Sequence, residues 1–536
     1  MKHINKLLSM LLILCMAALT LASCGGGGGG GSTGGGFVRD ESQLNILVFD
    51  GGYGNEYIIR IAEAFEAEYP GIDVVVEMTD TPQELISQIT AGRYVADIVM
   101  TISNITKQGV QGYVHDLTDV YESYAFGESD ITIGEKLAEA ADANNFDGHY
   151  YQIPTHTGAT GLVYNKVYLD AIYGEGNWEL PVTSDGLIAM FKDIQSKNAW
   201  PMVYTTSTEA EYSYWLRDIW IAQYLGYEGY KNYYNLQYEN EDGEFVTATT
   251  AEEFNAAMRP ARDSAIEALI NTMSNKLGNA PESCASMSFS QAQGYFVGYT
   301  SQPDAKEVNG HKGAAFMING DWLWSEVERY SQVVELDFRF MRTPINSAII
   351  DKLATVNSEE QLVECVKYID TVLDGTSGTR PAYLSDADYD RLLEARRMVR
   401  STHTQQSSFV PSNCSNVEVA KDFLKFYASD ACSLMYSDAL NGMKTIYNDE
   451  VCAENKLNTF TASINYALNS DPIRVSEFSS PYTVYGGLSF FRYHYFTQAM
   501  YKAVGASDAK AIIDWHENDN ANGWTKILNS YTPKED

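Results

Sequence analysis

The sequence predicts an α/β protein made of more than one lobe. From Leu44 onward, short apolar runs alternate with segments whose apolar residues recur every three or four positions, the patterns of buried strands and amphipathic helices. The chain has 536 residues, which exceeds what one hydrophobic core usually supports. Hydrophobic residues make up 45% of it and are spread evenly, so we expect a soluble globular protein beyond the N-terminal region.

The first predicted elements follow the order strand, helix, strand, helix, strand. Residues 44–49 have the pattern of a buried strand, and 51–54 form a tight glycine loop. Residues 58–69 carry apolar side chains at helical spacing, and Pro70-Gly71 ends that helix. The same patterns predict a strand over 72–76, a helix over 82–91 and a strand over 97–100. This βαβαβ order implies parallel strands joined by right-handed crossovers.

Later segments continue the alternation less regularly. A strand-rich region over 150–164 precedes long helical segments that reach about residue 300. A strand over 313–318 leads into a helix that Asp321 is placed to cap. Residues 375–411 look like an insertion that contains one polar helix, and 420–427 form an amphipathic helix in a largely helical C-terminal region.

The N-terminal region has the features of an export signal. Lys2 and Lys6 precede an apolar run over 7–21, which is too short for a stable membrane span. The following Leu-Ala-Ser-Cys resembles a bacterial lipobox, in which Cys24 receives lipid after removal of residues 1–23. The glycine-rich residues to 43 would form a flexible leash. A plain secretory signal with a chance cysteine is the alternative.

Charge and cysteine content limit the possible functions. The formal net charge of −34, without a Lys/Arg cluster, disfavours binding to nucleic acid or anionic lipid. Beyond Cys24 the chain has five cysteines without CxxC spacing, so no zinc site is indicated. Most of the five, Cys365 among them, are expected to be ordinary buried thiols. One disulfide among Cys414, Cys432 and Cys452 is possible, and the sequence does not determine whether any of the five, including Cys284, are paired.

Several segments, taken in order, carry a family resemblance. They are residues 46–54, 64–74 and 96–99, then 153–154 with 161–166, 181–183, 313–322 and 420–426. Together they resemble the family 1 extracellular solute-binding proteins of ABC importers, of which the maltose-binding type is the best known. The resemblance implies a two-lobe periplasmic-binding-protein-like fold (type II) with hinge strands and extra helices, in which ligand is enclosed by hinge closure.

The resemblance also implies a division of the chain. One lobe would take 44–155 and 335–450, and the other 160–334 and 451–536. Crossovers near 156–161 and 338–344 would form the hinge. The role of residues 375–411 is left open.

Ligand contacts are expected where aromatic and polar residues lie together, because sugar rings stack on flat apolar surfaces and their hydroxyls need fixed polar groups. By resemblance, Trp322 matches a stacking tryptophan, and Thr101 and Asn104 replace an aromatic and an acidic contact. Gly158 stands where a glutamate occurs in the maltose type, which argues against maltodextrin. The other candidates are Tyr53, Asn55, Glu56, Asp97, His156, Thr157, Glu209, Trp215, Asp321 and Tyr485.

These features predict a lipid-anchored, monomeric receptor on the extracytoplasmic face of the membrane. It would capture a carbohydrate, an oligosaccharide by preference, and deliver it to a membrane permease, without catalysis, cofactor or metal. Two alternatives stay open. One is the same fold binding a polyamine or metal ion, which the acidic charge or the 37 tyrosines could serve. The other is an anchored glycoside hydrolase, which would need two carboxylates across a cleft.

Overall fold

The structure is a computed structural model that describes residues 37, 39–205, 212–469, 471–487, 491 and 509–530. The predicted signal segment, Cys24, most of the glycine-rich linker and Glu209 lie outside these residues. Within the part of the chain that it describes, no helix has both the length and the apolar character needed to cross a lipid bilayer.

A first sheet has the strand order β2-β1-β3-β13-β4. Its strands are β1 (Gln43–Phe49), β2 (Asp73–Thr79), β3 (Ile98–Ile102), β4 (Ile153–Pro154) and β13 (Gln406–Phe409). β1 pairs in parallel with both β2 and β3, which confirms the predicted βαβαβ order. β13 joins from much later in the sequence and runs antiparallel to β3.

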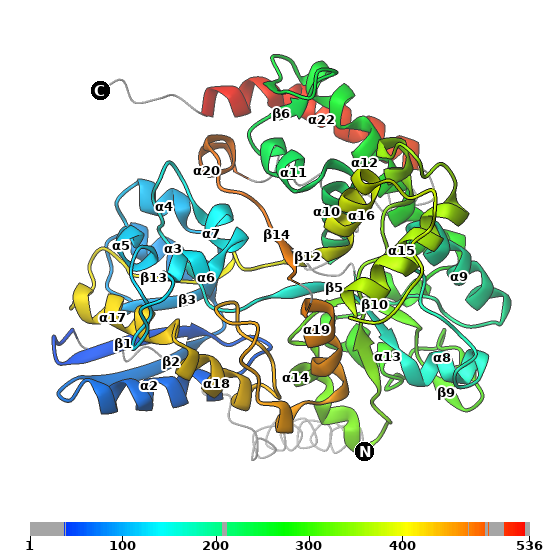
Figure 1. Ribbon diagram of the computed structural model, residues 1–536. Coiled ribbons are helices and arrows are strands. Elements are labelled where there is room, and N and C mark those ends of the chain that lie inside the picture. The colour runs from blue at the N-terminus through cyan, green and yellow to red at the C-terminus, as the bar shows by residue number, and fades with distance from the viewer. Residues whose placement is uncertain are drawn as a thin grey trace, which may run out of the picture. The chain divides into compact units, whose positions relative to one another are not determined.

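Helices around this sheet complete the first lobe. They are α2 (Glu56–Glu68), α3 (Pro82–Thr90), α4 (Thr106–Val110), α5 (Thr118–Tyr121), α6 (Ile133–Leu137), α7 (Glu139–Asn144), α17 (Val417–Tyr427) and α18 (Asp430–Ala439). On α2, Ile58, Ile61 and Phe65 face the core, as their spacing predicts, and Phe65 packs edge-on against Phe423. Figure 1 shows α2 and α18 side by side along the sheet.

A second sheet has the order β10-β5-β12-β14, with β11 also paired to β5. Its strands are β5 (Ala159–Asn165), β10 (Phe316–Gly320), β11 (Phe338–Phe340), β12 (Met398–Ser401) and β14 (Ile473–Val475). Every residue of β5 is buried, because strands or helices cover both of its faces. This sheet belongs to a second, larger hydrophobic core, which also includes Trp220 and Phe254.

The second lobe is mainly helical outside its sheet (Figure 1). Its helices are α8 (Lys166–Tyr173), α9 (Ser184–Ser196), α10 (Ser213–Leu225), α11 (Tyr227–Tyr233), α12 (Ala251–Met273), α13 (Phe289–Phe296), α14 (Leu323–Val327), α15 (Glu359–Leu373), α16 (Asp386–Arg397), α19 (Thr459–Leu468), α20 (Pro481–Gly486) and α22 (Ala509–Ser530). Two hairpins, β6 (Gln237–Glu239) with β7 (Phe245–Thr247) and β8 (Glu307–Val308) with β9 (His311–Lys312), and the short 3-10 helices η1 (Asn275–Leu277), η2 (Glu282–Ala285), η3 (Glu328–Gln332), η4 (Ser347–Lys352) and η5 (Glu454–Lys456) complete the described elements.

The chain passes between the sheets at positions that differ in part from the prediction. It leaves the first sheet after β4 through residues 155–158, as expected, and returns from β12 to β13 through 402–405. The expected second crossover at 338–344 is wrong, because β11 pairs with β5 and its Phe338 and Phe340 are buried in the second core. Residues 338–401 therefore lie with the second lobe.

The predicted insertion at 375–411 is also only partly correct. Its polar helix exists as α16, and Ser385 caps it by accepting a hydrogen bond from the N–H of Asp388. With α15 and η4 it encloses a small separate core that contains Leu362, Ile369 and Leu392. The end of the segment is not an insertion, since β12 and β13 are integral strands of the two sheets. The five cysteines in the described residues are free, and four of them are buried.

Candidate functional site

The carboxyl ends of β1 and β3 and the start of β13 lie at one edge of the first sheet, because β1 and β3 are parallel and β13 runs against them. This edge carries Tyr53 and Asn104 just beyond β1 and β3, and Gln406 as the first residue of β13. The second sheet brings Trp322 to the end of β10, close to the start of β5. Ligands of open α/β sheets bind beyond such strand ends, so the two edges define the candidate site.

Tyr53 connects the two edges. Its hydroxyl donates a hydrogen bond to Oδ1 of Asp321 and also lies 3.1 Å from Oε1 of Gln406. Its ring stacks on the imidazole of His156, with ring centres 4.0 Å apart, and meets Trp322 edge-on. The first βα turn therefore contacts the second lobe directly, as well as the first crossing segment.

Trp322 lies in an aromatic cluster of the second lobe. Tyr212 and Trp215 stack with ring centres 3.7 Å apart, and both meet Trp322 edge-on. The indole N–H of Trp215 is buried and finds no acceptor among the described residues. Trp322 itself is 7% exposed, so a ligand could stack on it only after the contact with Tyr53 opens. The cluster supplies the flat apolar surfaces that sugar rings need.

Asp321 does not cap the following helix, which corrects the prediction. The N-cap position of α14 belongs to Trp322, and no side chain caps that helix. Instead, Oδ2 of Asp321 accepts a hydrogen bond of 3.0 Å from the N–H of Ala159. Burial raises the pKa of this carboxyl from 3.8 to about 7, although the hydrogen bonds from Tyr53 and Ala159 oppose the rise.

His156 is held by neutral partners on both sides of its ring. Nδ1 lies 2.8 Å from the hydroxyl of Tyr436, and Nε2 lies 3.3 Å from that of Tyr57. Burial lowers the pKa of His156 to about 3, so the ring is neutral at physiological pH. Its next neighbour, Thr157, is also buried, and its carbonyl accepts a hydrogen bond from Ser401 of β12. His156 thus fixes the first crossing segment to the first lobe, and Thr157 fixes it to the second crossing segment.

Asn104 and Tyr485 line one pocket of about 270 Å³ between α4 and α20. Lys107 and Gln108 face the same pocket, and Oε1 of Gln108 is buried without a partner among the described residues. Across the pocket region, the hydroxyls of Thr106 and Ser479 lie 3.4 Å apart. Asn104 and Tyr485, which are far apart in the sequence, therefore line the same pocket.

The remaining candidates have other environments. Asn55 is exposed beside α2, and Glu56 forms an ion pair with Arg60. Asp97 lies before β3, at the end of the strand opposite to Asn104, and accepts hydrogen bonds from the N–H groups of Asn45 and Ser415. Thr101 is buried within β3, and its hydroxyl has no partner among the described residues.

Sequence reasoning did not select Gln406, Lys107 or Gln108. Gln406 went unnoticed because the start of β13 was interpreted as part of an insertion. The two residues of α4 lie in a short polar helix that carries no distinctive motif. Within the described ranges, no group of three or more His, Cys, Asp or Glu side chains could hold a metal ion.

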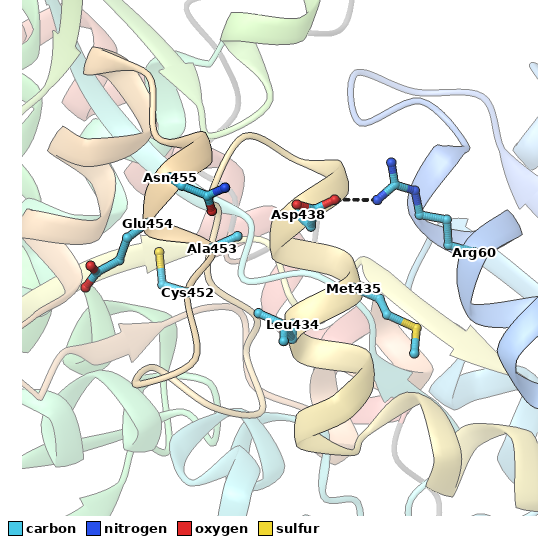
Figure 2. Close-up of a pocket in the computed structure, with 8 residues that line it drawn as sticks. All are labelled: Arg60, Leu434, Met435, Asp438, Cys452, Ala453, Glu454 and Asn455. Atoms are coloured by element: carbon cyan, nitrogen blue, oxygen red, sulfur yellow. Dashed lines mark hydrogen bonds and ion pairs between the residues drawn. The ribbon is translucent and has the colours of Figure 1, made fainter.

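A second hollow lies on the first lobe and shares no residue with the Tyr53–Trp322 cluster. It has a volume of about 850 Å³ and lies between α18 and residues 452–455. Figure 2 shows Arg60 and Asp438 pointing toward each other at one side of it, joined by an ion pair of 2.5 Å. Leu434 on its wall is 52% exposed. It is a broad, open surface depression, unlike the enclosed cluster between the sheets.

Comparisons with solved structures support the fold. The chain resembles RafE in complex with raffinose (14% identity, TM-score 0.53, covering 90% of this chain and 98% of that one). It also resembles a chitin oligosaccharide binding protein (14%, 0.56, 90% and 98%) and the ABC substrate-binding protein Lmo0181 from Listeria monocytogenes in complex with cycloalternan (14%, 0.54, 91% and 100%). These similarities show the same two-lobe α/β fold. Among curated proteins, none matches this sequence significantly.

The sequence itself matches a family model over residues 60–442, well over half of the chain. That model describes binding proteins that work outside the cell. The matched range includes both crossing segments and the turn that carries Asp321 and Trp322. This chain belongs to the family of bacterial extracellular solute-binding proteins.

Proposed function

We propose that this protein captures a carbohydrate, an oligosaccharide by preference, between its two lobes and delivers it to the permease of an ABC importer without altering it chemically. The observation that carries the proposal is the meeting of Tyr53, Trp322 and Trp215 with the polar groups of Asp321 and Gln406 at the facing edges of two sheets. Aromatic faces bind the C–H surfaces of sugar rings, and fixed polar groups bind their hydroxyls.

The similar solved structures agree with this ligand class. The ligands of those proteins are raffinose, chitin oligosaccharide and cycloalternan. Ligand that bridges both lobes would favour a closed form, which a permease can distinguish from the open form. In this proposal, the aromatic cluster binds one sugar unit, and the pocket lined by Asn104 and Tyr485 binds further units.

Calorimetric titration with raffinose, cycloalternan, chitin oligosaccharides and xylan fragments tests the ligand class. Binding of at least one of them is expected, and Trp322→Ala should weaken it about tenfold or more, since stacking contributes about 1.4 kcal/mol. Trp515→Ala, on the exposed side of α22, is the matched control and should leave affinity unchanged. Binding of spermidine or a metal ion instead, or release of reducing sugar, would contradict the proposal.

We also propose that lipid on Cys24 holds the protein at the membrane. The lipobox-like sequence and the glycine-rich residues after it support this, because a tether raises the effective concentration of the lobes near a permease. Metabolic labelling of the full chain with radioactive palmitate should mark the wild type but not Cys24→Ser. The variant should appear in the soluble fraction. Membrane association that survives this substitution would refute the anchor.

A further inference from the structure

The contact between Tyr53 and Asp321 joins the two lobes directly. Tyr53 follows β1 of the first sheet, and Asp321 follows β10 of the second. The same turn presses its backbone on Trp322, since a Cβ on Gly52 would lie 2.8 Å from the Cβ of Trp322. The stacking tryptophan is covered in this state.

The hydrogen bonds at this contact can be satisfied whether Asp321 is protonated or ionised. The Tyr53 hydroxyl has one hydrogen but faces two acceptors, Oδ1 of Asp321 and Oε1 of Gln406. If Asp321 carries a proton, it donates to Tyr53, and Tyr53 donates to Oε1 of Gln406. If Asp321 is ionised, Tyr53 donates to it, and the Gln406 amide can turn so that Nε2 donates to Tyr53. Burial therefore decides between the two forms, and it favours the protonated carboxyl.

One other carboxyl near Asp321 has a pKa raised to about 7 by burial: Glu326 of α14, which accepts a hydrogen bond from Gln293 within the second lobe. Tyr53 and Tyr436, from the β1–α2 turn and from α18, have pKa values raised well above 10, first by burial and then by Asp321 itself. His156, from the first crossing segment, is kept neutral by burial, which lowers its pKa to about 3. No Lys or Arg among the described residues forms an ion pair with Asp321, whose other partners are backbone N–H groups of the crossing.

We propose that Tyr53, Asp321 and Gln406 form a proton-linked latch that closes the two lobes on each other in the absence of ligand. Closing transfers Asp321 from water into the buried contact and takes up one proton. Acid therefore favours the latched form, in which Trp322 is covered, and higher pH releases it for binding. The inference does not depend on which solute the protein carries.

The direction of the pH effect follows from linkage. Asp321 has a pKa of about 7 when latched, and its ordinary value of 3.8 applies when opening exposes it to water. Between these values only the latched form holds the proton, so the closing equilibrium constant falls up to about tenfold for each unit of rising pH. Above pH 7 neither form is protonated, and closing no longer depends on pH.

Hydrogen-exchange mass spectrometry on the ligand-free, full-length protein tests this. After correction for intrinsic exchange rates, protection of the 50–57 turn and of the Ala159 amide should fall by up to about 25-fold from pH 5.5 to 7.5, most of it below pH 7. Asp321→Asn should keep these amides protected at both pH values, because its neutral amide still accepts from Ala159 and faces Tyr53. Tyr53→Phe keeps the ring on His156 but removes the hydroxyl, so it should show weak protection without pH dependence.

Tyr238→Phe is the matched control. It removes another tyrosine–carboxylate hydrogen bond, to Glu253, which lies wholly within the second lobe. It should retain the wild-type pH profile at the latch. Equal protection of the wild type at both pH values, or a pH dependence that persists in Tyr53→Phe or Asp321→Asn, would overturn the proposal. If Asp321→Asn fails to fold, comparing the pH dependence of amide protection in the wild type and in Tyr53→Phe still tests the proposal.

Discussion

Two buried carboxylates close to the crossing segments are held in opposite ways. Asp321 is 1% exposed and has only neutral hydrogen-bond donors around it among the described residues. Glu477 is 2% exposed and lies 2.9 Å from the guanidinium of Arg400 in β12. The first can be neutralised by a proton near pH 7, whereas the second is neutralised by a residue that is always charged.

The difference shows which part of the interface can move. Arg400 is fully buried, also faces Asp218, and donates to the backbone carbonyls of Ser401 and Val475. A buried cation with two carboxylates resists separation, because any broken pair leaves a charge without solvation. Neutral contacts such as Tyr53–Asp321 cost less to break. We therefore interpret the Arg400 cluster as the part of the interface that stays together, and the Tyr53–Asp321 contact as the part that separates when the lobes open.

The largest effect is expected from removing the fixed cation. Arg400→Met removes the cation that faces the buried Glu477, so it should lower the free energy of unfolding by about 3–5 kcal/mol in urea titrations, although Asp218 keeps its ion pair with Arg217. Arg397→Met is the control in the same part of the chain. It removes an ion pair with Asp471, which is 89% exposed, and should cost less than about 1 kcal/mol. Similar losses in both variants would contradict the distinction.

Gly158 lies between the Arg400 cluster and the Tyr53–Asp321 contact, and its substitution should cause the next largest loss of stability. Its φ is +58°, and an added Cβ would collide with Thr402 and lie 2.6 Å from Oε1 of Gln406. Gly158→Ala should therefore destabilise the protein by about 2–4 kcal/mol and weaken protection at the latch.

Gly148→Ala isolates the backbone part of this effect. Its φ is +82° and nothing lies within 4 Å of the added Cβ, so thermal unfolding should show a loss of only about 1 kcal/mol. If the two alanine variants melt alike, Gly158 does not need its small size at the crossing.

The sequence could predict the first sheet because its information is local. The strands and helices up to Ile102 follow one another with clear periodicity, and sequential parallel strands pair with their neighbours. β12 and β13 could not be predicted in this way. Each has only four residues and pairs with strands far away in the sequence: β12 with β5 and β14, and β13 with β3 and β4.

The site shows the same limit. The resemblance selected Trp322, whereas Tyr53 was selected by its place in the turn after the first strand. Nothing in the sequence indicates that Tyr53 meets Asp321, because 268 positions separate them and the contact depends on how two lobes face each other. Gln406 depends on the same arrangement, together with the unpredicted strand β13.

The pH dependence of the unfolding free energy distinguishes a carboxyl whose pKa is raised by folding from one whose pKa is lowered. Folding raises the pKa of Asp321 from 3.8 to about 7, so its stabilising contribution is complete below pH 4 and is lost as pH rises through 7. Compared with Asp321→Asn, the wild type should lose about 1–3 kcal/mol of unfolding free energy between pH 5 and 8.

Asp388 provides the opposite case for that measurement. Burial alone would raise its pKa, but hydrogen bonds from Thr355 and Ala354 lower it overall. Its contribution is present above its unfolded pKa and is lost only in acid, so the difference between wild type and Asp388→Asn should stay constant from pH 5 to 8. If the difference in unfolding free energy between wild type and Asp388→Asn changed with pH in this range, the surroundings of Asp388 and Asp321 would not set their pKa values in opposite directions.

The smallest effect is expected at the exposed edge of the same turn. Glu56 pairs with Arg60 one helical turn away, and their side chains are 65% and 39% exposed. Glu56→Gln should change the melting temperature by less than 1 °C, since such a pair contributes about 0.3–0.5 kcal/mol and Arg60 keeps Asp438 as a partner. It should also leave latch protection unchanged at pH 5.5 and 7.5. A shift of the latch profile in this variant would mean that surface charge, rather than the buried proton on Asp321, sets the pH response of the lobes.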